Sequence, residues 1–152
     1  QYPEALNLAV SLLAQRARSS GEIEQKLRDR FYLPETVEMV LYKLEREHLL
    51  NDADFARQWV EARSGRKLGR SRIAQELRRK GIDADEAEEA LSAIGEDAQL
   101  ADAIALAEKT AARAKSDEDP RKTYQRIAAM LARRGFRWDI TKEALAQVLQ
   151  AD

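Results

Sequence analysis

The sequence has no cysteine, which excludes a disulfide framework and a thiolate metal site and fits a reducing compartment such as the cytoplasm. Its only histidine, His48, has no cysteine with which to bind zinc and no evident nucleophile to activate. The phosphate-binding pattern GxxxxGK[ST] is missing. No apolar run approaches the roughly 20 residues of a membrane-spanning helix, and no signal peptide is visible, although the start at Gln1 leaves an upstream tail open. We therefore expect no enzyme activity, no cofactor, no metal and no membrane contact.

Proline and glycine, the residues that interrupt helices, account for only three and six of the 152 positions. Ala, Leu, Glu, Arg and Lys dominate instead, and apolar residues recur at helical spacing along the chain. Pro34 and Pro120 are placed to begin helices, while Gly81 and Gly135 are placed to end them. We predict an all-α protein of nine helices with no sheet.

One pattern, Ile-x-x-x-Leu followed fourteen residues later by Leu, occurs three times in the sequence. The copies are separated by 50 and then 54 residues, and they comprise Ile23, Leu27 and Leu41, then Ile73, Leu77 and Leu91, then Ile127, Leu131 and Leu145. Such self-similarity indicates a duplicated supersecondary unit. We predict three tandem three-helix repeats, at residues 1–50, 51–95 and 96–152, in an elongated or curved arrangement. A single globular all-helical domain is the alternative.

Charge is distributed unevenly although the net charge is only −1. Eight basic residues lie between positions 63 and 80, where Glu76 is the only acid, and five acids follow between positions 83 and 89. Gly65 and Gly69 bracket a basic loop, and the next helix begins with arginines that oppose its dipole. This local conflict favours a functional role, in contact with phosphate or with an acidic protein surface. The structural alternative is a solvated helix face with i, i+4 ion pairs.

The aromatic residues fit a packing role more readily than a binding role. Phe55 and Trp59 are four positions apart on one helical face, so we expect them in the core rather than as a platform for stacked bases. Trp138 follows the break at Gly135 and fits either a buried or an exposed position. Basic residues recur where the second helix of each repeat ends, which the helix dipole by itself would favour.

Two segments of the central repeat resemble the signature of the bacterial RecX family: residues 50–63, LNDADFARQWVEAR, and residues 69–82, GRSRIAQELRRKGI. Residues 18–28, RSSGEIEQKLR, and residues 131–136, LARRGF, resemble the family's flanking elements. The resemblance covers nearly the whole chain in order, and it implies tandem three-helix repeats. Family members often have proline where this chain has Arg70, which leaves the start of that helix open.

The resemblance implies a regulator of the RecA recombinase in DNA recombination, repair and the SOS response. Such a protein lies in the helical groove of the RecA filament on DNA, inhibits ATP hydrolysis and strand exchange, and promotes filament disassembly. We assign Phe55, Trp59, Leu77 and Gly81 to folding. We predict that a monomer contacts the RecA filament, and more weakly single- or double-stranded DNA, through Arg57, Arg63, Arg66, Lys67, Arg70, Arg72, Arg79, Lys80, Lys122, Arg126, Arg133 and Arg134.

Two other functions are compatible with these residues. A three-helix unit used as a helix-turn-helix would bind DNA without RecA and with a steep dependence on salt, although the near-neutral net charge counts against this as the main function. A helical scaffold for an unrelated protein would bind neither DNA nor a recombinase.

Overall fold

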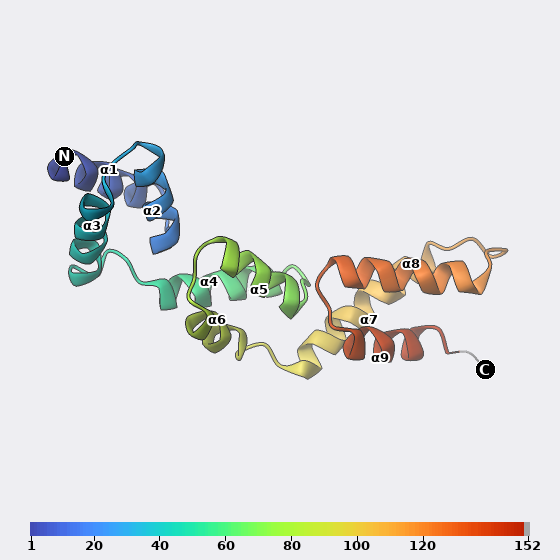
Figure 1. Cartoon of the computed structure of the whole chain (residues 1–152). Coiled ribbons are helices and arrows are strands. Elements are labelled where there is room, and N and C mark those ends of the chain that lie inside the picture. Colours follow the sequence, from blue (N-terminus) through green and yellow to red (C-terminus); the bar gives the residue numbers. More distant parts are fainter. Residues whose placement is uncertain (151–152) are drawn as a thin grey trace. The chain divides into compact units, whose positions relative to one another are not determined.

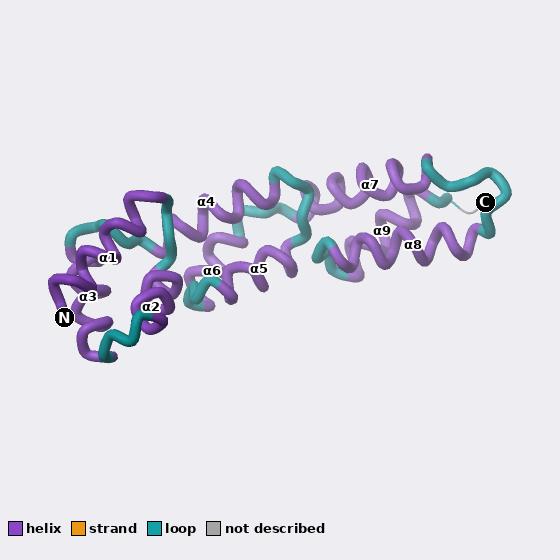
Figure 2. Tube along the Cα trace, turned by 90° about the horizontal axis from the view of Figure 1, so that it is seen from above, coloured by secondary structure: helices purple, strands orange, loops and turns teal. Residues whose placement is uncertain are grey.

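The computed structural model describes residues 1–150, and Figure 1 shows the course of the chain through them. No strand occurs among these residues, and Figure 2 shows helices joined by loops. The prediction of an all-α chain with nine helices is confirmed over this range, and the helices follow one another in three groups of three. They are α1 (Tyr2–Gln15), α2 (Ser20–Asp29), α3 (Pro34–Arg46), α4 (Asp52–Ser64), α5 (Arg70–Arg79), α6 (Ala84–Leu91), α7 (Glu96–Ala112), α8 (Pro120–Arg133) and α9 (Trp138–Val148).

The chain divides into two compact units. The first comprises Gln1–Trp59 and Leu77–Ala90, and the second comprises Val60–Glu76 and the chain from residue 91 onward. The helices α4 and α5 of the central repeat therefore each contribute one part to each unit. Each contact between repeats that is described below joins residues of the same unit.

The residues at the helix starts explain where several helices begin. Ser19 accepts a hydrogen bond at Oγ from the N–H of Glu22 (3.2 Å), and the Glu22 carboxylate accepts one from the N–H of Ser19 (3.1 Å), which forms a capping box before α2. Pro34 and Pro120 occupy the first turns of α3 and α8, where the missing N–H leaves no helical bond unmade. The helix α5 begins at Arg70, so a proline is not required there.

Each middle helix of a repeat is followed by a residue in the left-handed region. Gly81 after α5 has a φ of 77°, and Gly135 after α8 has a φ of 94°. Glycine reaches these angles without a clash of Cβ, so the predicted helix ends are confirmed. In the first repeat the equivalent residue is Phe31, which has a φ of 64° and a side chain that is 89% exposed.

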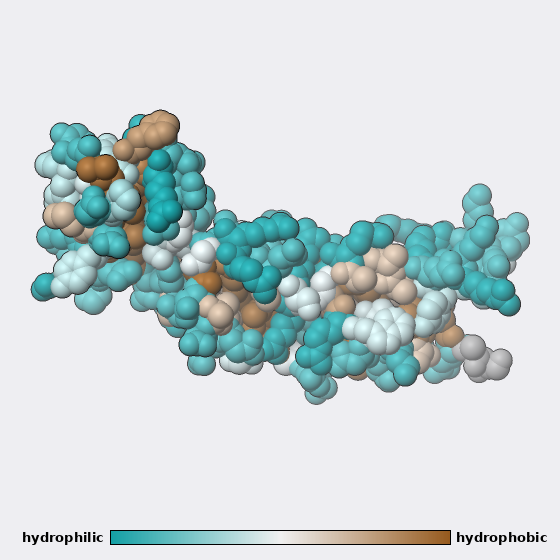
Figure 3. All heavy atoms as spheres, in the orientation of Figure 1, coloured by the Kyte–Doolittle hydropathy of each residue, from teal (hydrophilic) through white to brown (hydrophobic). Residues whose placement is uncertain are grey.

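The repeated Ile and Leu pattern marks the core of each repeat. Its first two positions are fully buried in all three copies, and the third is buried as Leu91 and Leu145 but only half-buried as Leu41. Burying one such side chain contributes about 1.5–3 kcal/mol to folding, so packing by itself accounts for the pattern. On the face shown in Figure 3, most surface side chains are hydrophilic and hydrophobic ones form separate patches.

The aromatic residues differ in exposure. Phe55 is buried, as predicted, and its ring stacks on the half-buried ring of Trp59 with 6.0 Å between the centroids. Trp138, at the start of α9, is 59% exposed, which decides between the two positions that the sequence left open. The predicted folding roles of Phe55 and Leu77 agree with their burial.

Candidate partner-binding surface

The basic loop between α4 and α5 is fixed by contacts with the end of α8. The N–H of Gly69 donates to the carbonyl of Arg134 (2.7 Å), and the N–H of Ser71 donates to the carbonyl of Gly135 (3.1 Å). The backbones approach so closely that a Cβ on Gly69 would collide with Gly135, and a Cβ on Gly135 would collide with Arg72. We call this contact between the second and third repeats the second joint.

Two arginine side chains reinforce the second joint by donating to main-chain carbonyls. Arg134 donates from Nη2 to the carbonyl of Arg66 (2.6 Å) and from Nε to the carbonyl of Lys67 (3.1 Å). Arg72 donates from Nη1 to the carbonyl of Arg133 (3.2 Å). These bonds hold cations of the loop, of α5 and of α8 close together in spite of their mutual repulsion.

Gln99, a buried residue of α7, connects the same loop to the third repeat. Its Oε1 accepts a hydrogen bond from the N–H of Arg70 (2.9 Å), and its Nε2 donates to the carbonyl of Leu68 (3.4 Å). The orphan N–H at the start of α5 is satisfied in this way. Nothing in the sequence singled out Gln99, because one polar residue on a helix carries no signal of a contact 29 positions away.

Glu76 on α5 is the acid of the basic stretch, and it is mostly buried. Arg63 donates to it from Nε to Oε1 (2.9 Å) and from Nη2 to Oε2 (2.7 Å), and the Nε of Arg72 lies 3.7 Å from Oε2. The hydrogen bonds to Glu76 outweigh the effect of burial and hold the pKa of Arg63 above its usual value. Arg63 therefore stays charged, and part of its charge is balanced by Glu76.

The second joint brings together seven of the twelve residues that we predicted to contact a partner. Arg66 and Lys67 are exposed in the loop, and Arg72 and Arg133 are exposed beside it, while the other three are half-buried. Like charges gathered in this way create a positive potential that attracts acidic groups. We call the group the basic surface; it consists of Arg63, Arg66, Lys67, Arg70, Arg72, Arg133 and Arg134.

Lys122 and Arg126 continue the basic surface along α8. They share a helical face with Arg133, because separations of 4 and 11 residues are close to whole turns at about 3.6 residues per turn. Both side chains are exposed. The carboxylate of Glu118 accepts a hydrogen bond from Arg126, which raises the pKa of that guanidinium.

The other three predicted contact residues belong to the first unit: Arg57, Arg79 and Lys80. Arg57 and Arg79 are exposed, and Arg57 pairs with Asp54. Lys80 is half-buried, and its Nζ lies 3.4 Å from Oε2 of Glu22 and 4.6 Å from the ring centroid of Trp59. The structure thus places the charge of Lys80 against groups of the protein itself.

Lys80 belongs to a contact between the first and second repeats, which we call the first joint. The hydroxyl of Ser19 donates to the carbonyl of Lys80 (2.5 Å). A Cβ on Gly21 would lie 2.7 Å from that carbonyl oxygen and 2.9 Å from the Cα of Gly81. The first joint therefore also requires glycine on both sides.

Two acidic side chains contribute to the first joint, and one of them pairs with cations. Asp52 accepts hydrogen bonds from the N–H (2.8 Å) and the hydroxyl (2.5 Å) of Ser20. Glu22 pairs with Arg16 (3.0 Å) as well as with Lys80. Burial of Glu22 opposes its ionisation, but hydrogen bonds from Arg16 and from the backbone, together with the charge of Lys80, outweigh burial and lower the pKa of Glu22.

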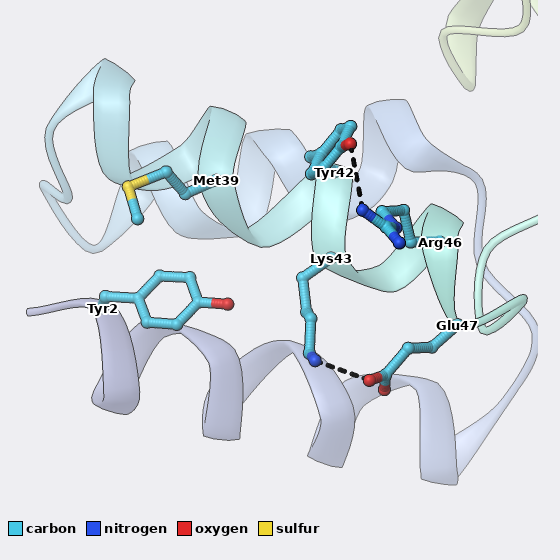
Figure 4. Close-up of a pocket in the computed structure, with 6 residues that line it drawn as sticks. All are labelled: Tyr2, Met39, Tyr42, Lys43, Arg46 and Glu47. Atoms are coloured by element: carbon cyan, nitrogen blue, oxygen red, sulfur yellow. Dashed lines mark hydrogen bonds and ion pairs between the residues drawn. The ribbon is translucent and has the colours of Figure 1, made fainter.

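A hollow of about 520 Å³ on the first repeat is another candidate place for a site (Figure 4). In it, Lys43 pairs with Glu47 (2.6 Å) and Arg46 donates to the hydroxyl of Tyr42 (3.4 Å), and both are i, i+4 pairs at α3. The arrangement contains no nucleophile with a base beside it. None of the predicted contact residues lines this hollow, whose walls are Tyr2, Met39, Tyr42, Lys43, Arg46 and Glu47.

Residues 1–150 also bear on metal binding and on membrane crossing. Within this range no group of three or more His, Cys, Asp or Glu residues is arranged to hold a metal ion. Nor does any helix of the range combine the length and the apolar character that a membrane crossing requires.

Three family models match the chain in consecutive order. The first three-helix domain of RecX matches residues 5–44, the second matches residues 51–91, and the third matches residues 97–145. Together they account for most of the three helical groups described above.

Individual relatives agree with these matches. The chain is 37% identical over 150 residues to the regulatory protein RecX of Mycobacteroides abscessus, covering 94% of this chain and 72% of that protein. It is 35% identical over 137 residues to the regulatory protein RecX of Amycolatopsis mediterranei, covering 90% and 78%. The crystal structure of RecX from Lactobacillus salivarius is similar with a TM-score of 0.87 at 28% identity, covering 99% and 97% of the two chains. The chain belongs to the RecX family of regulatory proteins.

Proposed function

We propose that this protein regulates a RecA-type recombinase by binding its filament on DNA through the basic surface. Its relatives are named regulatory proteins, which supports a regulatory rather than a catalytic role. The observation that carries the proposal is the basic surface, in which hydrogen bonds across the second joint and the Arg63–Glu76 pair hold seven cations close together. Phosphate groups or acidic side chains of the filament are the matching partners.

Tandem repeats suit a partner that is itself repetitive. A chain of three helical units that touches successive protomers of a filament gains avidity from each additional contact without any strong single site. Occupation of the filament groove would exclude the second duplex and favour the inactive filament state. The expected results are inhibition of ATP hydrolysis and of strand exchange, and faster filament disassembly.

The first test is RecA ATP hydrolysis on single-stranded DNA, with this protein titrated in below one molecule per RecA. We expect strong inhibition by the wild-type chain. We expect the variant Arg66→Ala, Lys67→Ala, Arg70→Ala, Arg72→Ala to require at least about tenfold more protein, because each lost charged contact is worth roughly 0.5–1 kcal/mol or more. Circular dichroism checks that helicity is retained.

A charge-matched control separates this surface from net charge. The control variant replaces four exposed cations outside the predicted set with alanine: Lys26, Arg30, Lys109 and Lys142. It should inhibit as the wild type does. Equal loss of inhibition in both variants would show that only total charge matters, and unchanged inhibition in the first variant would remove the basic surface from the mechanism.

DNA binding without a recombinase is the second candidate, because the same exposed cations suit phosphate. The two functions differ in what they require. Tight binding to DNA alone, with an affinity that falls steeply with salt and with no effect on ATP hydrolysis by RecA, would favour the second candidate. Weak binding to DNA alone, combined with inhibition of RecA, would favour the first.

A further inference from the structure

The loop that carries Arg66 and Lys67 has an unusual backbone for exposed, charged residues. Lys67 has a φ of 57°, in the left-handed region that residues with a Cβ seldom adopt. The N–H of Arg66 donates to the carbonyl of Arg63 (3.1 Å), and the N–H of Lys67 donates to the carbonyl of Ser64 (3.0 Å). The carbonyls of Arg66 and Lys67 accept hydrogen bonds from another part of the chain. A left-handed conformation of this kind persists where the surroundings hold it.

That partner is Arg134, from the end of α8 in the next repeat. Its guanidinium donates to both carbonyls, at 2.6 Å to that of Arg66 and at 3.1 Å to that of Lys67. Its own carbonyl accepts a hydrogen bond from the N–H of Gly69 at 2.7 Å. One residue therefore holds three positions of a five-residue loop, 65–69, through its side chain and its main chain together.

We propose that Arg134 is a positioning residue, which acts by fixing the loop that presents Arg66 and Lys67 to the partner, and that its charge is not itself the contact. This inference rests on the proposed function of the basic surface. It changes the role that the sequence predicted for Arg134, because a guanidinium that donates to two carbonyls is oriented toward the protein. Lysine carries the same charge but cannot donate in this two-pronged geometry, so the two roles make opposite predictions for a lysine at this position.

The neighbouring Arg133 supplies the matched control. It stands one position earlier on the same helix, and its side chain is exposed. Arg133 contributes to the second joint through its main-chain carbonyl, which accepts a hydrogen bond from Arg72 (3.2 Å). A substitution of the side chain leaves this carbonyl in place. The variants Arg134→Lys and Arg133→Lys therefore have the same net charge and differ in the bonds to the loop.

The first readout is hydrogen exchange in the free protein, which does not depend on any partner. In Arg134→Lys we expect the amides of residues 65–69 to exchange roughly tenfold faster than in the wild type, because hydrogen bonds from a charged donor are lost and about 1.4 kcal/mol corresponds to a factor of ten. In Arg133→Lys exchange should be unchanged. Equal exchange in Arg134→Lys and the wild type would overturn the positioning role.

The second readout is the concentration that half-inhibits RecA ATP hydrolysis. Arg134→Lys should raise it about as much as the double variant Arg66→Ala, Lys67→Ala does. Arg121→Lys, at an exposed arginine of α8 outside the basic surface, should leave it within about twofold of wild type. If Arg134→Lys shows faster loop exchange but normal inhibition, the inference is overturned. The double variant tests the proposed function independently of that result. If the double variant itself inhibits normally, the loop is not the contact, and the proposed function fails at this surface.

Discussion

The first joint and the second joint each bring a glycine against a left-handed glycine, but different side chains surround the two contacts. In the first joint Gly21, in the first turn of α2, lies against Gly81, and in the second joint Gly69, directly before α5, lies against Gly135. The first joint is bridged by side-chain groups, such as the Ser19 hydroxyl and Glu22. The second is bridged by main-chain N–H groups and by guanidinium groups that donate to carbonyls.

This difference decides where charge is available. In the first joint the ammonium of Lys80 meets the carboxylate of Glu22 and the face of Trp59, so the protein itself balances it. In the second joint the guanidinium of Arg134 donates to the neutral carbonyls of Arg66 and Lys67, whose own cationic side chains are exposed. Both joints therefore connect two repeats through a contact between glycines. The second joint also gathers cations that are exposed.

The first repeat shows what glycine is needed for. Phe31 occupies the position of Gly81 and Gly135 and adopts a similar left-handed φ, yet its side chain is exposed. The left-handed angle alone is therefore tolerated with a side chain, at a cost of about 1–2 kcal/mol. What excludes a side chain at Gly81 and Gly135 is the backbone that lies against them.

The largest expected effect comes from breaking the second joint at its glycine. In Gly135→Ala the new Cβ would collide with Arg72, and alanine is unfavourable at a φ of 94°. We expect the free energy of unfolding to fall by about 3 kcal/mol, combining the backbone cost with that of overpacking. Urea denaturation followed by circular dichroism measures it.

The opposite change at the equivalent turn sharpens the comparison. Phe31→Gly should leave the free energy of unfolding within about 1 kcal/mol of wild type, because it relieves the left-handed strain and removes a side chain that is 89% exposed. Comparable losses in Phe31→Gly and Gly135→Ala would contradict the view that the neighbouring backbone sets the need for glycine.

A smaller effect is expected when the carboxylate among the arginines is removed. Glu76→Gln takes away the charged acceptor of Arg63 and leaves that guanidinium, 22% exposed, with a weaker partner. The free energy of unfolding should fall by about 1–3 kcal/mol. The exposed acid Glu61 on α4 provides the control, since Glu61→Gln should change it by less than about 0.5 kcal/mol. Equal effects would mean that the Arg63–Glu76 pair does not stabilise the fold.

The smallest effect is a pH dependence confined to the first joint. Because the folded-state pKa of Glu22 is lowered from 4.5, its ionised form stabilises the protein above that pH, and the contribution is lost as the pH falls through the folded-state pKa. Glu22→Gln keeps the capping hydrogen bond and removes the charge. The free energy of unfolding of the wild type should exceed that of this variant by about 1 kcal/mol at neutral pH. The difference should shrink gradually as the pH falls below 4.5. A difference that stays constant on acidification would show that the charge of Glu22 contributes nothing.

The helices and the core followed from the sequence because both depend on local spacing. Ile23 and Leu27 recur with the same spacing in the other two repeats, which predicts that these residues form the core. Their complete burial confirms this prediction. The left-handed turns at Gly81 and Gly135 were equally predictable, since glycine after a helix has one usual use. The turn at Phe31 was not, because phenylalanine gives no local sign of that conformation.

The candidate site was predictable in composition but not in arrangement. Lys80-Gly81 and Arg134-Gly135 are similar in sequence, and both cations were predicted to contact a partner. Their surroundings differ because Glu22 lies 58 positions before Lys80, whereas the carbonyls bound by Arg134 lie 67 and 68 positions before it. No local pattern distinguishes a cation that closes an internal ion pair from one that braces a loop.

Hydrogen exchange of this protein bound to a RecA filament on single-stranded DNA tests the central claim most directly. Free and bound protein are compared peptide by peptide at the two joints. We predict slower exchange on binding at residues 65–72 and 133–135 of the second joint, and little change at residues 19–22 and 80–81 of the first. Protection confined to the first joint, with the second unchanged, would contradict the assignment of the basic surface as the place where the partner binds.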